Sequence, residues 1–212
     1  DDILMRMVFV GGAVASLYYQ DPAASRIRPT LDVDCVLKIS SRMQYNTIED
    51  ELRNRGFRND MRPGAPICRW IYEGVTVDVM LTEDPLLGFS NRWYDEGIDN
   101  AIHANLPSGR EIRIFSLPYF IAAKIEAFKG RGGDFRFSHD IEDVVMVLDA
   151  QLDFDSLDKA PVTVKNYLKH EFASMAVDGG FLESVSGYIG YTPTSTNRAR
   201  RVVSFMSEFG GV

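Results

Sequence analysis

Three aspartates interrupt two apolar, strand-like runs of this chain. Asp32 and Asp34 lie in the run LDVDCVLKI at 31–39, and Asp78 lies in VTVDVML at 75–81. Because side chains alternate along a strand, Asp32 and Asp34 share one face, and the apolar residues between them share the other. A carboxylate among apolar neighbours is unfavourable unless something compensates it. The fold must therefore supply a compensating group for these acids.

Mg²⁺ is a natural partner for acids placed in this way. Two carboxylates two residues apart on one strand repel each other unless a cation neutralises them. Mg²⁺ takes oxygen ligands in tight octahedral geometry and shares them with phosphate groups. Metal ions held by Asp32, Asp34 and Asp78 would orient a triphosphate and stabilise attack at phosphorus. The alternative is a solvated D-x-D face on an edge strand, and Asp78 inside its apolar run argues against it.

A Gly-Gly turn is a second feature suited to phosphates. Gly11 and Gly12 separate a short strand at 8–10 from a segment with a helical pattern at 13–20. Backbone N–H groups and the positive end of a helix attract anions at such a turn, and glycine permits a close approach. A tight connection without a ligand is the alternative. The chain contains neither a P-loop sequence nor a G-x-G-x-x-G motif, which excludes those phosphate-binding classes.

Strand patterns and helical patterns divide the chain. Strand-like runs end at about residue 115, with one amphipathic helical segment among them at 43–55. A Glu-Gly pair predicts a hairpin between 68–72 and 75–81. From residue 117 the pattern is helical, and helices are expected at 117–129, 138–148, 161–176, 181–188 and 196–209. We therefore expect an α/β lobe over residues 1–115 and a helical lobe over residues 116–212.

Composition excludes several classes of protein. No apolar stretch reaches the roughly 18 residues that span a membrane, and the run 7–19 lacks the architecture of a signal peptide. Cys35 and Cys68 lie in apolar runs, which predicts two buried, reduced thiols. These features predict a cytoplasmic protein with no membrane partner. The formal net charge of −7 disfavours a polyanion partner, although a local basic patch can still bind one.

Together these motifs resemble the DNA polymerase β-like nucleotidyltransferase superfamily. More narrowly, FVGGAVASLY at 9–18 and RPTLDVD at 28–34 are similar to AbiEii-type nucleotidyltransferases, a family that includes toxins of toxin–antitoxin pairs. LPYFIAAKIEAF at 117–128 and SHDIEDV at 138–144 are similar to that family's helical motif. The resemblance covers about residues 8–150. It implies an α+β fold, with a nucleotidyltransferase-like mixed sheet flanked by helices and followed by a helical lobe.

The resemblance also implies roles for the acids and glycines. Asp32 and Asp34 would be the principal Mg²⁺ ligands. Asp78 would be the third acid, as a general base or a shared metal ligand. Gly11 and Gly12 would cradle the triphosphate of a bound nucleotide. The gap from Gly12 to Asp32 is longer than the common spacing of the superfamily, and the loop between them can absorb the difference.

Basic residues complete the predicted nucleotide site. By the same resemblance, Lys124 would contact the triphosphate, and Asp140 would orient that lysine or the nucleotide. Arg69, on the strand before Asp78, is a further cation expected to face the bound nucleotide. On physical grounds alone, Lys124 is equally well explained as a surface lysine whose stem lies along apolar neighbours. Stacking on its strand neighbour Trp70 is the alternative for Arg69.

Three further segments have a functional and a structural explanation. The loop KGRGGDFR at 129–136 would contact phosphates or would be a solvated connection. Ser138 would cap a helix whose acidic first turn suits the helix dipole. The aromatic and basic cluster NRWY at 91–94 would stack on a base or pack in the core.

The resulting hypothesis is nucleotidyl transfer. An acceptor hydroxyl attacks the α-phosphorus of a nucleoside triphosphate and pyrophosphate leaves, with Mg²⁺ and Lys124 offsetting its charge. The toxin-like resemblance implies a tRNA or protein hydroxyl as acceptor and a cognate antitoxin as partner, and an aminoglycoside- or lincosamide-like molecule is the alternative acceptor. A catalytically silent nucleotide-binding module is a second hypothesis, because Ala13 replaces the usual serine. Transfer of the γ-phosphate is a third.

Overall fold

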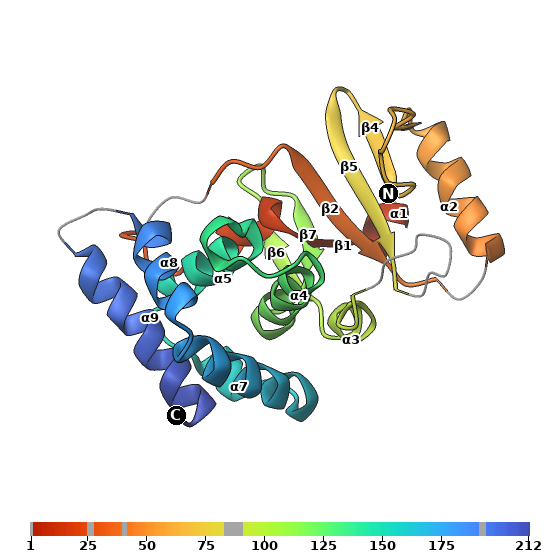
Figure 1. The fold of residues 1–212 in the computed structure, drawn as a ribbon. Helices are drawn as coiled ribbons and strands as arrows, with labels where there is room; N and C mark the ends of the chain where they lie inside the picture. The colour runs from red at the N-terminus through yellow and green to blue at the C-terminus, as the bar shows by residue number, and fades with distance from the viewer. Residues whose placement is uncertain (1, 25–27, 40–41, 83–90, 191–193) are drawn as a thin grey trace. The chain divides into compact units, whose positions relative to one another are not determined.

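A computed structural model describes residues 2–24, 28–39, 42–82, 91–190 and 194–212 of the chain, so part of the loop expected between Gly12 and Asp32 lies outside the described residues. The chain forms two compact units. The first comprises residues 1–17 and 29–116, and the second comprises residues 18–28 and 117–212. Figure 1 colours the strands of the first unit from red to yellow-green and most helices of the second from green to blue.

Among the described residues of the first unit, seven strands form one mixed sheet in the order β3-β4-β5-β2-β1-β7-β6 (Figure 1). β2 is parallel to β5 and β1 is parallel to β7, and the other neighbouring pairs are antiparallel. This arrangement confirms the predicted mixed sheet. The strands are β1 (Val8–Val10), β2 (Asp32–Leu37), β3 (Arg58–Asn59), β4 (Arg69–Tyr72), β5 (Val75–Leu81), β6 (Ile102–Asn105) and β7 (Glu111–Ile114).

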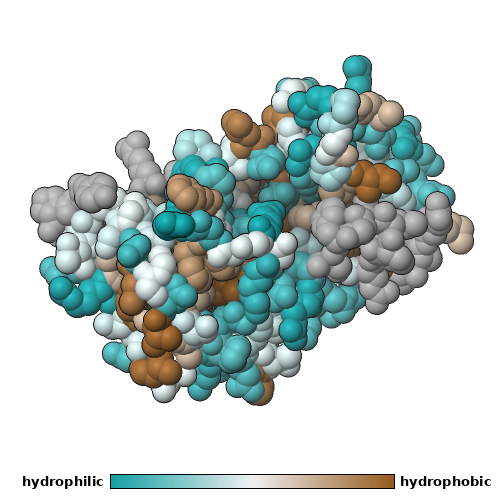
Figure 2. Space-filling model, viewed as in Figure 1, coloured by the Kyte–Doolittle hydropathy of each residue, from teal (hydrophilic) through white to brown (hydrophobic). Residues whose placement is uncertain are grey.

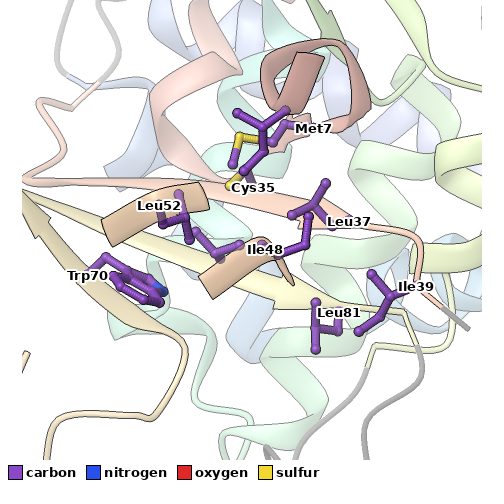
Figure 3. Packing of buried hydrophobic residues seen from close by; sticks show 10 residues of the cluster. Met7, Cys35, Leu37, Ile39, Ile48, Leu52, Trp70 and Leu81 are labelled. Atoms are coloured by element: carbon purple, nitrogen blue, oxygen red, sulfur yellow. The ribbon is translucent and has the colours of Figure 1, made fainter. Parts of the chain in front are cut away.

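One face of this sheet is packed against helices α1 (Asp2–Arg6) and α2 (Arg42–Asn54). Ile48 and Leu52 are four residues apart, so both lie on the face of α2 that meets the strands (Figure 3). Fully burying a leucine contributes about 1.5–3 kcal/mol. The strand residues of this cluster alternate with the aspartates along β2 and β5, which places the aspartates on the opposite face. These strand residues are Cys35, Leu37, Trp70, Val79 and Leu81.

The first unit contains two thiols. Cys35 and Cys68 are both free and buried, as the sequence predicts. Burial raises the pKa of the Cys68 thiol to about 11, and it also raises the pKa of Cys35. Both groups are therefore neutral at physiological pH and act as small apolar side chains.

Several short elements of the first unit differ from the sequence prediction. The segment after Gly11 forms a 3-10 helix, η1 (Gly12–Tyr18), where a helix over 13–20 was expected. Strands β3 and β6 and helix α3 (Tyr94–Asp99) were not predicted. Such short segments depend on tertiary contacts rather than on local pattern. In α3, for example, Asp99 accepts hydrogen bonds of 2.9 Å from Lys38 at the end of β2.

The second unit is a bundle of helices around an apolar core. Leu148, Leu168, Phe172, Phe181 and Met206 are all fully buried in it. The helices predicted here are confirmed to within about two residues at each end, a difference expected for helix termini. The elements are α4 (Leu117–Gly130), η2 (Phe135–Phe137), α5 (His139–Asp149), α6 (Asp155–Asp158), α7 (Val162–Ala176), α8 (Gly179–Ile189) and α9 (Ser195–Gly210).

An early segment of the chain is bonded to the helices of the second unit. The backbone N–H groups of Gln20 and Asp21 donate to the carbonyl of Ala150 over 3.0 and 2.9 Å. Arg198 donates to Asp21 over 2.8 Å and to the fully buried carboxylate of Asp149 over 2.9 Å. Burial raises the pKa of Asp149, and the hydrogen bond from Arg198 opposes that rise. These bonds explain why residues 18–28 belong to the helical unit.

The described helices are all too short or too polar to cross a membrane. On the face drawn in Figure 2, hydrophobic residues lie at separate places among hydrophilic ones. Exposed residues such as Leu31, Met61 and Phe137 are likewise far apart in the sequence. Single exposed apolar side chains are ordinary on protein surfaces.

Candidate metal centre

The aspartates predicted from the sequence meet on the face of the sheet opposite α2. Asp34 on β2 is the register partner of Asp78 on the parallel strand β5, and Asp32 lies two residues before Asp34 on the same face. One carboxylate oxygen from each of the three lies within 4.8 Å of the others. Asp78 is buried, whereas Asp32 and Asp34 are partly exposed. We call Asp32, Asp34 and Asp78 the acidic triad.

The triad has the donor atoms and the spacing that a divalent cation requires. All three side chains offer hard oxygen ligands, which Mg²⁺ and Ca²⁺ prefer. Oxygens that share one Mg²⁺ ion are about 3 to 4 Å apart, given Mg–O distances of about 2.1 Å. The triad oxygens lie within 4.8 Å of one another, which is close to that range. The residues present therefore fit a divalent metal.

Gly11 makes room for the triad. It follows Val10, the register partner of Asp34, and has a φ angle of 72° in the left-handed region. A Cβ atom at this position would lie 2.0 Å from Oδ2 of Asp34. Glycine is therefore required here both by the backbone conformation and by the approach of the carboxylate. Gly12 begins η1, so the N-terminus of an α-helix that the sequence prediction invoked for anion binding is not formed at this turn.

Thr30 holds one member of the triad and was not predicted. Its hydroxyl donates a hydrogen bond of 2.5 Å to Oδ1 of Asp32, and the backbone N–H of Asp32 is 3.5 Å from the same hydroxyl. A threonine two residues before an acid forms such local bonds readily. The pattern T-x-D in the sequence was a usable signal for this contact.

Arg69 lies beside the triad on β4, where it is the register partner of Asp78. Its Nε donates to Oδ1 of Asp78 over 2.8 Å, and its Nη2 donates to Oδ2 over 2.7 Å. These hydrogen bonds raise the pKa of Arg69 above its usual range, so the guanidinium stays charged. The alternative of stacking on Trp70 is wrong, because Trp70 lies on the packed face and Arg53 covers its ring at 5.5 Å.

Lys124 and Asp140, the other predicted residues, belong to the second unit. Nζ of Lys124 lies 3.2 Å from Oδ1 of Asp140 and 2.7 Å from Oδ2 of Asp143. Arg131 completes the cluster, with Nη1 lying 2.5 Å from Oδ2 of Asp140. Burial opposes the charge of Lys124, but Asp143 and Asp140 outweigh it and raise the pKa of the lysine. The alternative of a surface lysine is wrong, since its side chain is only 14% exposed.

The loop at 129–136 and the helix after it are held by local contacts. Lys129 donates to Glu171 over 2.7 Å, and Arg136 pairs with Asp134 over 3.0 Å. Ser138 caps α5 as predicted, because its hydroxyl accepts the N–H of Ile141 over 3.2 Å. Together with the contact of Arg131, these bonds engage the basic side chains of the loop with acids of the same unit.

The segment at 91–94 packs in the first unit. Trp93 is only 1% exposed, and the guanidinium of Arg92 lies 5.0 Å from the centre of its ring. The structural explanation of this cluster therefore accounts for Trp93, which has no exposed ring face for a base.

Comparison with known proteins bears on the fold. No protein-family model and no curated protein matches this sequence. Among solved structures, the chain is similar to the crystal structure of an antigenic nucleotidyltransferase-like protein from Paracoccidioides brasiliensis. The TM-score is 0.50 at 18% sequence identity, over 92% of this chain and 84% of that chain. The likeness establishes a nucleotidyltransferase-like fold for this protein.

Proposed function

We propose that this protein is a Mg²⁺-dependent nucleotidyltransferase, which moves a nucleoside monophosphate from a nucleoside triphosphate to an acceptor hydroxyl. The observation that carries the proposal is the meeting of Asp32, Asp34 and Asp78 within 4.8 Å on one face of a nucleotidyltransferase-like fold. Three carboxylates at such distances repel one another strongly unless they share cations. Nucleotide phosphates are the usual partners of Mg²⁺ held by carboxylates.

In this proposal each acid has a defined task. Asp32 and Asp34 hold the metal, which when bound neutralises phosphate charge and makes the acceptor hydroxyl easier to deprotonate. Asp78 is a shared ligand or the general base for the acceptor. Thr30 keeps Asp32 oriented through its hydrogen bond of 2.5 Å, so the ligand is in place before substrate arrives.

The glycines and basic residues would bind the triphosphate. Gly11 approaches Asp34 so closely that an added Cβ would lie 2.0 Å from Oδ2. The N–H groups of the Gly11-Gly12 turn would bind phosphates that are shared with the metal. Lys124 would contact the triphosphate, oriented by Asp140, and the bond of 3.2 Å between them supports the orienting part of that role. Arg69 would contact the nucleotide through Nη1, since its Nε and Nη2 donate to Asp78.

The acceptor and the cellular role follow from the resemblance alone. We propose an AbiEii-type, toxin-like enzyme of the cytoplasm that modifies a tRNA or protein hydroxyl and is controlled by a cognate antitoxin. A small aminoglycoside- or lincosamide-like molecule is the alternative acceptor. The net charge of −7 favours a cationic small molecule more than an extended polyanion.

A catalytically silent nucleotide-binding module is the second function that specific observations favour. Ala13 lacks the hydroxyl that usually follows the glycine turn, and the ammonium group of Lys124 already has two carboxylate partners. Such a chain would bind a nucleotide and Mg²⁺ without transferring any group.

Labelled nucleotides separate these functions. The protein is incubated with Mg²⁺ and each of ATP, GTP, CTP and UTP, labelled at the α- or the γ-phosphate, in the presence of total tRNA, protein or aminoglycosides. Nucleotidyl transfer attaches the α-label to an acceptor and releases pyrophosphate, and the double variant D32N/D34N abolishes both. Attachment of the γ-label would identify phosphoryl transfer instead. Calorimetric binding of a nucleotide without release of pyrophosphate would favour the silent module.

A further inference from the structure

We infer that Arg69 is a positioning residue that sets the preference of the acidic triad for Mg²⁺ by fixing the carboxylate of Asp78. The inference rests on the proposed function, because it concerns the ion that the triad binds. It assigns Arg69 a task on the protein itself, in addition to any contact with the nucleotide.

The sheet places Arg69, Asp78 and Asp34 in one row. β4, β5 and β2 are neighbours, Arg69 is the register partner of Asp78, and Asp78 is the register partner of Asp34. Neighbouring strands are about 4.8 Å apart. Asp78 therefore lies between the guanidinium on one side and the other acids on the opposite side, all on one face of the sheet.

The fork of Arg69 fixes both oxygens of Asp78 at once. Each oxygen accepts one N–H, over 2.8 and 2.7 Å, which defines the plane of the carboxylate as well as its position. A carboxylate can accept about four hydrogen bonds or ligand contacts, so each oxygen of Asp78 keeps one site for a metal. The pair is well shielded, because the side chains of Arg69 and Asp78 are 29% and 11% exposed.

A fixed carboxylate matters more for Mg²⁺ than for Ca²⁺. Mg²⁺ requires near-ideal octahedral geometry at about 2.1 Å, whereas Ca²⁺ accepts six to eight ligands at longer and more variable distances. Partners that orient a metal ligand typically change metal affinity about 10- to 100-fold. If the fork is lost, Asp78 can rotate, and binding of the stricter ion should weaken more.

The charge of Arg69 alone would have the opposite effect. A guanidinium next to a divalent cation repels it, so removal of that charge without any change in geometry would strengthen the binding of both ions. Lysine keeps the charge but cannot form the two parallel hydrogen bonds. The variants R69K and R69M therefore separate the two effects. Loss of positioning lowers metal affinity in both variants, whereas loss of charge alone raises the affinity of R69M and leaves that of R69K unchanged.

The experiment measures binding of Mn²⁺ by electron paramagnetic resonance and its displacement by Mg²⁺ or by Ca²⁺, for wild type, R69K and R69M without nucleotide. We expect R69K to lose about tenfold in Mg²⁺ affinity and less than about threefold in Ca²⁺ affinity. In R69M the lost charge offsets part of both losses, so the same fall in the ratio of Mg²⁺ to Ca²⁺ affinity is expected with higher affinities for both ions. The matched control is R136M, because Arg136 of the second unit forms a similar fork on Asp134, with distances of 3.1 and 3.0 Å. R136M should leave both affinities unchanged.

Each other outcome has a definite meaning. If the ratio of Mg²⁺ to Ca²⁺ affinity in R69K equals that of the wild type, the inference is overturned, and the proposed metal site stays intact. A wild-type protein that binds no divalent ion would overturn the proposed metal site itself. Thermal unfolding without metal shows which variants are folded. If R69M does not fold, the affinities of R69K alone test the inference.

Discussion

Among the described residues, a cluster of acids in the first unit and another in the second are built on opposite principles. The second unit buries Asp140 and Asp143 with Lys124, and Arg131 pairs with Asp140, so each acid has a basic partner. The triad of the first unit instead gathers three acids on one face of the sheet, where Asp78 pairs with Arg69 and the other two acids are partly exposed. A balanced buried cluster stabilises a fold only while it is complete. A cluster that contains more acids than bases and is partly open to solvent is suited to reversible binding of a cation.

Asp34→Asn tests the triad side of this comparison, and we expect the largest effect from it. Loss of one metal ligand should lower the rate of nucleotidyl transfer roughly a thousandfold, whereas the free energy of unfolding should stay the same or rise by up to about 1 kcal/mol, because like charges repel. Transfer assays and urea denaturation measure the two quantities. The control is Asp50→Asn on α2, whose side chain is 74% exposed. A large loss of stability in D34N would contradict the comparison.

Lys124→Met tests the balanced cluster. Removal of the lysine leaves Asp140 and Asp143 buried without their shared partner, so the free energy of unfolding should fall by about 3–5 kcal/mol. The control is Lys159→Met, since Lys159 is 76% exposed and its pair with Asp155 should contribute less than about 1 kcal/mol. Urea denaturation compares the two variants. Equal losses would show that the Lys124 cluster is not the buried, interdependent group described above.

Gly11→Ala tests the close approach of the turn to the triad. The new Cβ would meet Oδ2 of Asp34, in a backbone conformation that alanine rarely adopts, and we expect a loss of about 2–3 kcal/mol in stability together with weaker Mn²⁺ binding. Gly109→Ala is the matched control, because Gly109 has a φ of 80° and nothing within 4 Å of its Cβ position. It should lose only about 1 kcal/mol and keep its metal affinity. Equal losses of stability and of metal affinity in the two variants would show that the close approach of Gly11 to Asp34 contributes to neither quantity.

The smallest expected effect is a change, at alkaline pH, in the contribution of Lys124 to the free energy of unfolding. The pKa of Lys124 is raised in the folded protein, so its contribution to stability is fully present below the unfolded value of 10.5 and is lost as the pH rises through the folded value. The difference in unfolding free energy between wild type and K124M should therefore be constant from pH 8 to 10. Above pH 10.5 it should shrink by no more than about 1.4 kcal/mol per pH unit. A difference that grows with pH would contradict the assigned partners of Lys124.

The sequence indicated much of the triad because its signal is local. The alternation around Asp32 and Asp34 shows that they share a face, and Asp78 stands out in its apolar run. Which strands are neighbours is a non-local property, so the register of Asp34 with Asp78 and of Asp78 with Arg69 required the structure. The sheet was predicted as a class, whereas its strand order was not.

The second cluster shows a different limit of sequence analysis. Asp143 is closer to Lys124 than Asp140 is, at 2.7 against 3.2 Å, yet in the sequence it was only one of three acids near the start of a helix, where the helix dipole accounts for part of them. Burial of Lys124 depends on the packing of α4 with α5, which carries Asp140 and Asp143, and the pattern of α4 alone does not show this contact. Gln20 and Asp21 bond to Ala150 and Arg198 of the helical unit, and these contacts also join residues that are distant in sequence.

Crystals grown with Mn²⁺ and a non-hydrolysable nucleoside triphosphate analogue provide the most direct test of the acidic triad as a metal centre. The account predicts an anomalous density peak within about 2.5 Å of oxygens from Asp32, Asp34 and Asp78, bridged to the phosphates. A bound analogue whose metal lies elsewhere, with no peak at the triad, would contradict it.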